Sequence, residues 1–282
     1  MAFTSFEKII LEELHKDQFQ EDITAQLLQE KGLKTAQAVV VARAEGIFCG
    51  KSILLSFREI FNGQLEFDWN MQDGDELEPQ QVAVELKGPA SSILSVERTL
   101  LNLLGLVCGV STLTRKFVNS VRPFPTAILA TRKTLPGLRD LQLEAVVAGG
   151  GKIHRRSLSD GILIKENHCE IESALTLLNR AHLNRSPLHG IEIEVQSFEA
   201  LESVLSSKNL PDIIMLDNFS PEVASKAVSL IRSKSPLIRI EASGGMNLRT
   251  VQLFAEAGVD YISVGQLTHS APVFDFSLDF QK

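Results

Sequence analysis

The second half of this sequence repeats short apolar runs with helix-length spacers between them, and this repeat restricts the folds open to the chain. From residue 191 onward the runs start 21, 26 and 23 residues apart, a spacing typical of alternating strands and helices. Spacers such as 197–205 and 221–231 carry Leu, Val and Ile at helical intervals. We therefore predict a parallel α/β barrel, with an open doubly wound sheet as the alternative. The predicted strands are 127–130, 161–165, 191–195, 212–216, 238–242 and 261–264.

The first half follows a different pattern. Residues 4–15 place an apolar stripe beside an acidic one and predict an amphipathic helix. β-structure is predicted for 36–48, 65–69 and 81–87. A long apolar helical segment begins at Ser91 and contains Gly105 and Gly109, four residues apart. We interpret this segment as the hinge between two domains.

The composition excludes several classes of protein. A chain of 282 residues that is 44% hydrophobic can bury a large core. The net charge of −7 and the lack of a long basic run argue against binding to nucleic acid. Cys49, Cys108 and Cys169 lack paired spacing, so neither a disulfide framework nor a zinc site is expected. No stretch reaches 18 uninterrupted apolar residues, and we expect a soluble, cytoplasmic protein without a membrane partner.

One stretch runs against the overall charge. Between Arg132 and Lys165, seven Lys and Arg residues stand against three acids, a local balance of 7 − 3 = +4. Such an island attracts a compact anion. Arg132, His154 and Arg155 supply directional donors suited to carboxylates, whereas Lys133 and Lys165 supply point charges.

Polar residues also follow the later predicted strands, at the end where barrel enzymes place their active sites. Ser243–Gly244–Gly245 and Gly265 expose backbone N–H groups to which a phosphate can bind closely; ordinary turns are the alternative. Glu194 and Asp217 end neighbouring strands, where carboxylates can hold Mg²⁺ or stabilise a positive sugar centre. Salt bridges to the lysines of the barrel are the alternative for this pair.

These residues resemble the quinolinate phosphoribosyltransferase family, also called nicotinate-nucleotide pyrophosphorylase (carboxylating). The resemblance extends over nearly the whole chain, with departures at Leu135, Ile153 and Ser157. The matching motifs are 22–24, 97–99, 131–139, 149–155, 163–168, 216–219, 243–245 and 268–272.

The resemblance implies a glycosyltransferase that joins quinolinate to phosphoribosyl pyrophosphate (PRPP) with Mg²⁺, giving nicotinate mononucleotide, pyrophosphate and CO₂ in NAD biosynthesis. It implies an N-terminal α/β sandwich domain over 1–110 and a C-terminal parallel α/β barrel of six or seven strands over 111–269. The last residues, about 270–282, are expected to pack back on the first domain. A homodimer with shared active sites is also implied.

The resemblance assigns roles to individual positions. Arg132, His154 and Arg155 would bind the quinolinate carboxylates, together with the partner subunit's Arg98. Lys133 and Lys165 would contact oxygens of the substrates and pyrophosphate. The ribose and its metal would face Glu194 and Asp217, and the 5-phosphate would be held by Ser243, Gly244, Gly245 and Gly265.

Two other functions fit parts of the pattern. A ModD-like relative of the family would share the motifs around Arg132 and His154 and act on another substrate, although Lys165 and Asn167 favour the quinolinate enzyme. A non-catalytic anion-binding barrel would need no carboxylates opposite the cations, and Glu194 and Asp217 argue against it.

Overall fold

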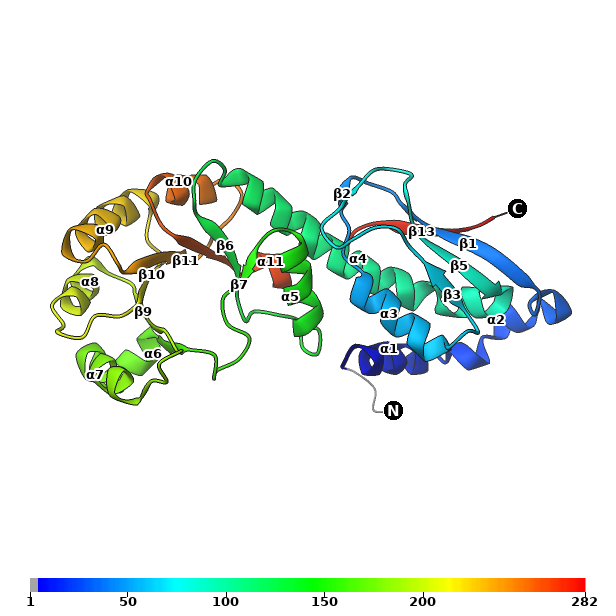
Figure 1. Cartoon of the computed structure of the whole chain (residues 1–282), viewed down its shortest axis with the longest axis horizontal. Helices are drawn as coiled ribbons and strands as arrows, with labels where there is room; N and C mark the ends of the chain where they lie inside the picture. The colour runs from blue at the N-terminus through cyan, green and yellow to red at the C-terminus, as the bar shows by residue number, and fades with distance from the viewer. Residues whose placement is uncertain (1–4, 282) are drawn as a thin grey trace. The chain divides into compact units, whose positions relative to one another are not determined.

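The computed structural model describes residues 5–281, which form two compact units (Figure 1). The first unit contains the described residues up to Arg115, together with Leu135–Gly150 and the residues from Ala271 onward. The second unit contains Lys116–Thr134 and Gly151–Ser270. The domain division at residues 110 and 111 stays a prediction. Thr4, where the first predicted helix starts, lies outside the described residues.

The first unit is built on a four-stranded antiparallel sheet in the order β13-β1-β5-β3. Its strands are β1 (Thr35–Ala42), β3 (Glu66–Asp68), β5 (Val82–Pro89) and β13 (Phe276–Phe280). A separate pair joins β2 (Gly46–Ile47) to β4 (Glu76–Leu77). The C-terminal strand β13 pairs with β1, with Phe280 opposite Ala38. The sequence-based prediction of an N-terminal unit that combines helices with a sheet is confirmed.

Helix α3 packs on this sheet. Helix α3 buries Leu54, Phe57 and Phe61, and the ring of Phe57 lies 5.6 Å from that of Phe67 on β3. The helical elements are α1 (Ser5–Lys16), η1 (Phe19–Glu21), α2 (Ile23–Gln26), η2 (Gln29–Lys31), α3 (Lys51–Phe61), α4 (Ala90–Ser120) and α5 (Arg139–Ala148). Burial of aromatic rings between α3 and β3 fixes the helix on the sheet.

Helix α4 is long and apolar because it lies in the core. An 18-residue window of this helix has a mean hydropathy of 1.6, as a membrane span would, but 67% of that window is buried. Its two glycines allow the C-terminal segment to cross it closely. The carbonyl of Gly105 accepts a hydrogen bond from the N–H of Phe274 at 2.9 Å, and a Cβ added at Gly109 would lie 2.0 Å from the carbonyl oxygen of Pro272.

The second unit is a seven-stranded parallel sheet in the order β7-β6-β12-β11-β10-β9-β8. The last strand pairs with the first, Val264 opposite Ala130, so the sheet curves round into a barrel. Among the seven described strands of this sheet, only β7 and β8 follow one another in the chain without pairing, which leaves one open seam. The strands are β6 (Ala127–Ala130), β7 (Lys152–Ile153), β8 (Ile162–Ile164), β9 (Ile191–Val195), β10 (Ile213–Asp217), β11 (Arg239–Ser243) and β12 (Tyr261–Val264).

Helices lie outside this sheet (Figure 1). The helices after β9 and β10 begin at serine caps where the strand has just ended. Ser197 Oγ accepts a hydrogen bond from the N–H of Ala200, and Ser220 Oγ accepts one from the N–H of Val223. The helices are α6 (Glu166–Cys169), α7 (Ala174–Asn184), α8 (Phe198–Leu205), α9 (Pro221–Lys234), α10 (Val251–Glu256) and α11 (Gln266–His269). The predicted parallel barrel is confirmed, and it has seven strands. Six of them were predicted from the sequence, and β7 was not.

Because the C-terminal segment crosses α4 so closely, we predict that no side chain larger than that of glycine fits at position 109 without a clash. Gly109→Ala should lower the free energy of unfolding in urea by about 2 kcal/mol, because overpacking outweighs the gain in helix propensity. At Gly190, where the nearest atom would lie 4.0 Å from an added Cβ, the change to Ala should cost less than about 0.5 kcal/mol. Equal losses at the two positions would contradict this packing argument.

Candidate active site

A cavity of about 520 Å³ lies at the carboxyl ends of the parallel strands. Its lining contains all but two of the site residues predicted from the sequence. Because parallel strands end at a common edge, residues more than 100 positions apart meet there. The predicted residues in the lining are Arg132, Lys133, His154, Arg155, Lys165, Glu194, Asp217, Ser243, Gly244 and Gly245.

Lys165 and Glu194 form an ion pair in this cavity. Lys165 Nζ lies 2.5 Å from Glu194 Oε2, and the side chain of Glu194 is only 4% exposed. Burial and a hydrogen bond with Glu166 raise the pKa of Glu194 to about 7, although the charge of Lys165 opposes this. Glu194 therefore forms the salt bridge to a barrel lysine that the sequence offered as the alternative. Its role in metal binding or catalysis stays a prediction. Glu166, at the start of α6, also lines the cavity and was missed by sequence reasoning.

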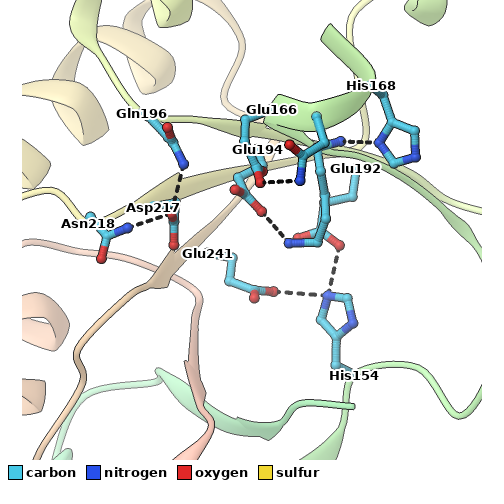
Figure 2. A network of polar contacts seen from close by, with 11 residues as sticks. His154, Glu166, His168, Glu192, Glu194, Gln196, Asp217, Asn218 and Glu241 are labelled. Atoms are coloured by element: carbon cyan, nitrogen blue, oxygen red, sulfur yellow. Dashed lines mark hydrogen bonds and ion pairs between the residues drawn. The ribbon is translucent and has the colours of Figure 1, made fainter. Parts of the chain in front are cut away.

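Asp217 is held differently, by amides. Its Oδ2 accepts hydrogen bonds from Gln196 Nε2 at 3.2 Å and from Asn218 Nδ2 at 2.6 Å (Figure 2). No ion pair involves Asp217 within residues 5–281. Gln196 and Asn218 received no role from the sequence, although each directly follows a strand. Their amide donors keep the Asp217 carboxylate oriented beside the cavity.

The loop after β11 packs tightly on the loop after β10. The N–H of Asn218 donates to the carbonyl of Ser243 at 2.9 Å. Gly244 has φ +90°, and a Cβ placed there would lie 2.2 Å from Asn218 Oδ1. Gly245 also has positive φ, +60°, but an added Cβ there would meet no atom within 4 Å. Only glycine at position 244 allows this backbone to reach the cavity.

His154 lies between two buried carboxylates that sequence reasoning missed. Its Nε2 is 2.7 Å from Glu192 Oε2 and 3.4 Å from Glu241 Oε2 (Figure 2). Burial alone would lower the pKa of His154, but a hydrogen bond with Glu192 and the charges of both glutamates raise it to about 10. Burial and the charge of Glu241 raise the pKa of Glu192, against the effect of His154. The contacts with the two carboxylates therefore favour the protonated imidazole.

The cations of the cavity are crowded. Burial and the nearby charge of Arg132 lower the pKa of Arg155. Arg132 Nε is buried and has no hydrogen-bond partner among the described residues. Unsatisfied donors and mutually repelling cations are both stabilised when an anion binds. The arrangement therefore favours an anionic ligand.

Two sets of residues have the chemistry of metal ligands. Glu194 and Asp217 offer oxygen atoms, which Mg²⁺ prefers. The ligand atoms of His154, Glu192 and Glu241 lie within 4.8 Å of one another, but this set includes a ring nitrogen already occupied by a hydrogen bond. For Mg²⁺ the predicted pair, Glu194 and Asp217, has the better donor chemistry.

The two remaining predicted residues lie elsewhere. Gly265 directly follows β12, and a Cβ added there would lie 3.2 Å from Lys133 Cδ. Arg98 is exposed on α4 in the first unit and lines a separate cavity of about 500 Å³, together with Asn102 and Leu138.

Comparison with known proteins gives matches over nearly the full chain. Sequence profiles of the N-terminal and C-terminal domains of quinolinate phosphoribosyl transferase match residues 22–108 and 110–279. The probable nicotinate-nucleotide pyrophosphorylase [carboxylating] of Bacillus subtilis is 38% identical over 259 residues, which cover 92% of this chain and 87% of the relative. The nicotinate-nucleotide pyrophosphorylase [carboxylating] of Mycobacterium leprae is 36% identical over 94% of both chains.

A solved structure agrees with these matches. The nicotinate-nucleotide pyrophosphorylase of Ehrlichia chaffeensis superposes with a TM-score of 0.90 at 33% identity and covers 100% of both chains. The fold described above, with its antiparallel sheet and its seven-stranded parallel barrel, is therefore shared with that enzyme.

The packing of the two loops predicts different effects at neighbouring glycines. Gly244→Ala should weaken binding of inorganic phosphate at least about tenfold, because the methyl group must displace Asn218 and the loop. Gly245→Ala should weaken it only about threefold, the cost of a left-handed alanine without a clash. Isothermal titration calorimetry measures both affinities, and equal losses would contradict the close contact at Gly244.

Proposed function

The chain belongs to the quinolinate phosphoribosyltransferase family, and from this membership we propose how its cavity catalyses the reaction. The enzyme transfers the phosphoribosyl group of PRPP to quinolinate and releases pyrophosphate and CO₂, which forms nicotinate mononucleotide for NAD biosynthesis. The main support for this function is that cations, carboxylates and a glycine loop line the same cavity. The chain is also related over most of its length to nicotinate-nucleotide pyrophosphorylases.

The chemistry needs positioning more than proton transfer. The pyridine nitrogen of quinolinate already carries a lone pair, and it attacks C1 of the ribose. The N–C1 bond forms as the C1–O bond breaks, and pyrophosphate leaves with the bonding electrons. The ring nitrogen is then positive, so the bond from C2 to its carboxylate can break. CO₂ leaves, the electron pair stays on C2, and a proton from water replaces the carboxylate.

Charges in the cavity match the charges of this reaction. Positive charge develops at C1 during transfer, and Glu194 and Asp217 would stabilise it from the sugar side. Lys133 and Lys165 would bind the oxygens of the leaving pyrophosphate. If the substrates break the ion pair between Lys165 and Glu194, Lys165 becomes free to bind pyrophosphate and Glu194 becomes free to stabilise the charge at C1.

The two anionic substrates divide the rest of the cavity. Arg132, His154 and Arg155 would bind the carboxylates of quinolinate, since Arg132 Nε has no hydrogen-bond partner among the described residues and the contacts of His154 with Glu192 and Glu241 use only its Nε2. Ser243, Gly244, Gly245 and Gly265 would hold the 5-phosphate through backbone N–H groups. Alignment of the nitrogen with C1 is then mainly a consequence of binding both substrates.

Mg²⁺ fits the oxygen donors of Glu194 and Asp217, of which Asp217 keeps only amide partners. When bound, Mg²⁺ would neutralise charge on the pyrophosphate group. Magnesium usually takes one or two carboxylates, together with substrate oxygens and water.

We propose that the enzyme acts as a homodimer in the cytoplasm. Arg98 belongs to the first unit and does not line the cavity that contains the other cations. An exposed arginine on a helix of one subunit can complete a carboxylate site on another, so the partner subunit's Arg98 would bind quinolinate.

Substrate choice tests the function directly. Purified protein with Mg²⁺ and PRPP should form nicotinate mononucleotide from quinolinate but not from nicotinate, because the cations of the cavity bind both carboxylates. Loss of one charged contact of this kind costs at least about tenfold in kcat/KM. Chromatographic detection of the product measures both reactions. Equal use of nicotinate would contradict the assignment of a two-carboxylate pocket.

Mixing of subunits tests the shared site. Arg98→Ala and Arg132→Ala should each lower kcat/KM for quinolinate about 100-fold, because each removes a charge-assisted hydrogen bond. Heterodimers of the two variants should regain part of the activity, since one of their two sites would contain both arginines. Heterodimers isolated with two different affinity tags that stay as inactive as the parent variants would exclude the shared site.

A further inference from the structure

The contacts of His154 suggest a role for two glutamates to which the proposed reaction assigns none. Glu192 on β9 and Glu241 on β11 direct their carboxylates toward the same ring nitrogen of His154 (Figure 2). The side chains of Glu192 and Glu241 are 6% and 0% exposed. All three residues line a second cavity of about 320 Å³ that also borders residues of β7 and β8, and His154 lines the main cavity as well. His154 therefore connects the buried acids to the substrate cavity.

The two acids are poorly satisfied by anything except His154. Glu192 Oε1 and both carboxylate oxygens of Glu241 are buried without a hydrogen-bond partner among the described residues. Burial of a carboxylate in this state is costly, and it destabilises a fold unless a cation compensates for it. The imidazolium of His154 is the cation in contact with both acids.

Without these acids, His154 would lose its proton. Burial favours the neutral ring, and a neutral imidazole offers only one N–H. That N–H could serve Glu192 or a substrate carboxylate, but not both. With both nitrogens protonated, Nε2–H is held by the glutamates and Nδ1–H remains a donor. Within residues 5–281, Nδ1 has no hydrogen-bond partner.

We propose that Glu192 and Glu241 are positioning residues that hold His154 as an imidazolium, with Nε2–H fixed between them and Nδ1–H left to donate to a carboxylate of the aromatic substrate. This inference rests on the proposed function for the identity of that substrate. This role explains why two buried glutamates lie close to a cavity that binds two anions. The glutamates contact the histidine and not the substrate.

Other charged groups surround His154, and they do not replace the glutamates. The groups that share a cavity with it are Arg132, Lys133, Lys152, Arg155, Asp160, Lys165, Glu166, Glu194, Asp217 and Tyr261. Among these groups and the two glutamates, the ion pairs of His154 are with Glu192 and Glu241 alone. A metal ion bound by the same three residues is the competing explanation, and it requires that Nε2 carry no proton.

NMR titration of the protein without substrates tests the state of the ring. In protein labelled with ¹³C at histidine Cε1, the resonance missing from His154→Asn identifies His154. In the wild type it should stay in the imidazolium position from about pH 6 to about pH 9, well above the ordinary histidine pKa. In Glu192→Gln/Glu241→Gln it should titrate below about pH 7. A wild-type resonance that titrates near its ordinary pKa would overturn the proposal.

Steady-state kinetics tests the consequence for binding. Glu241→Gln should raise KM for quinolinate roughly tenfold near pH 8, the effect expected when a charged donor becomes neutral, and leave KM for PRPP unchanged. Lowering the pH toward about 6 should restore KM, because the ring regains its proton. The exposed Glu202→Gln on α8 is the matched control, for which neither KM should change. Equal increases in both KM values, without recovery at low pH, would indicate a structural role and overturn the proposal.

Two further results separate this proposal from a metal site and from the proposed function. Stoichiometric binding of Zn²⁺ to the wild-type protein, lost in Glu241→Gln, would support a metal site and overturn the proposal. Failure of the wild type to consume quinolinate would contradict the proposed function alone, because the NMR titration needs no substrate.

Discussion

Parallel hydrogen bonding between β12 and β6 joins the last strand of the second unit to its first, with Tyr261 opposite Ala127 and Val264 opposite Ala130. This pairing brings the loop that contains Lys133 beside Gly265 and helix α11. Thr268 Oγ1 then donates to the carbonyl of Lys133 at 2.7 Å. Without this closure, the cations after β6 would lie at an edge of an open sheet, away from the glycines after β11 and β12.

In and beside the cavity, the acids and their partners form three separate networks, not one mixed cluster. Glu194 is paired with Lys165, Asp217 is held by amides, and Glu192 and Glu241 share His154. The three networks therefore differ in their partners and in how easily an anion can displace them. An anion that enters the cavity can displace the exposed contacts while the fully buried ones keep their geometry.

Sequence reasoning located most strands of the barrel within one residue, because a strand buried on both faces is a continuous apolar run. It missed β7, which has only two residues, one of them the exposed Lys152. The carboxyl-end rule gathered Arg132, Glu194, Asp217 and the glycines. The same rule could not find Glu192 and Glu241. The residue that a buried glutamate contacts depends on the strand register and on the path of the loop after β7, and the sequence pattern specifies neither. The place of Arg98 in a second subunit is likewise not decided by one chain.

The pairing of β13 with β1 has a consequence for the order of folding. The first unit needs residues from both ends of the chain, since Ala38 to Ala42 pair with Phe280 to Phe276. During synthesis from the N-terminus, every residue of the second unit is added to the chain before this edge strand is made. The part of the protein that is translated first is therefore completed last, and until then β1 is an unprotected sheet edge that can pair with other chains.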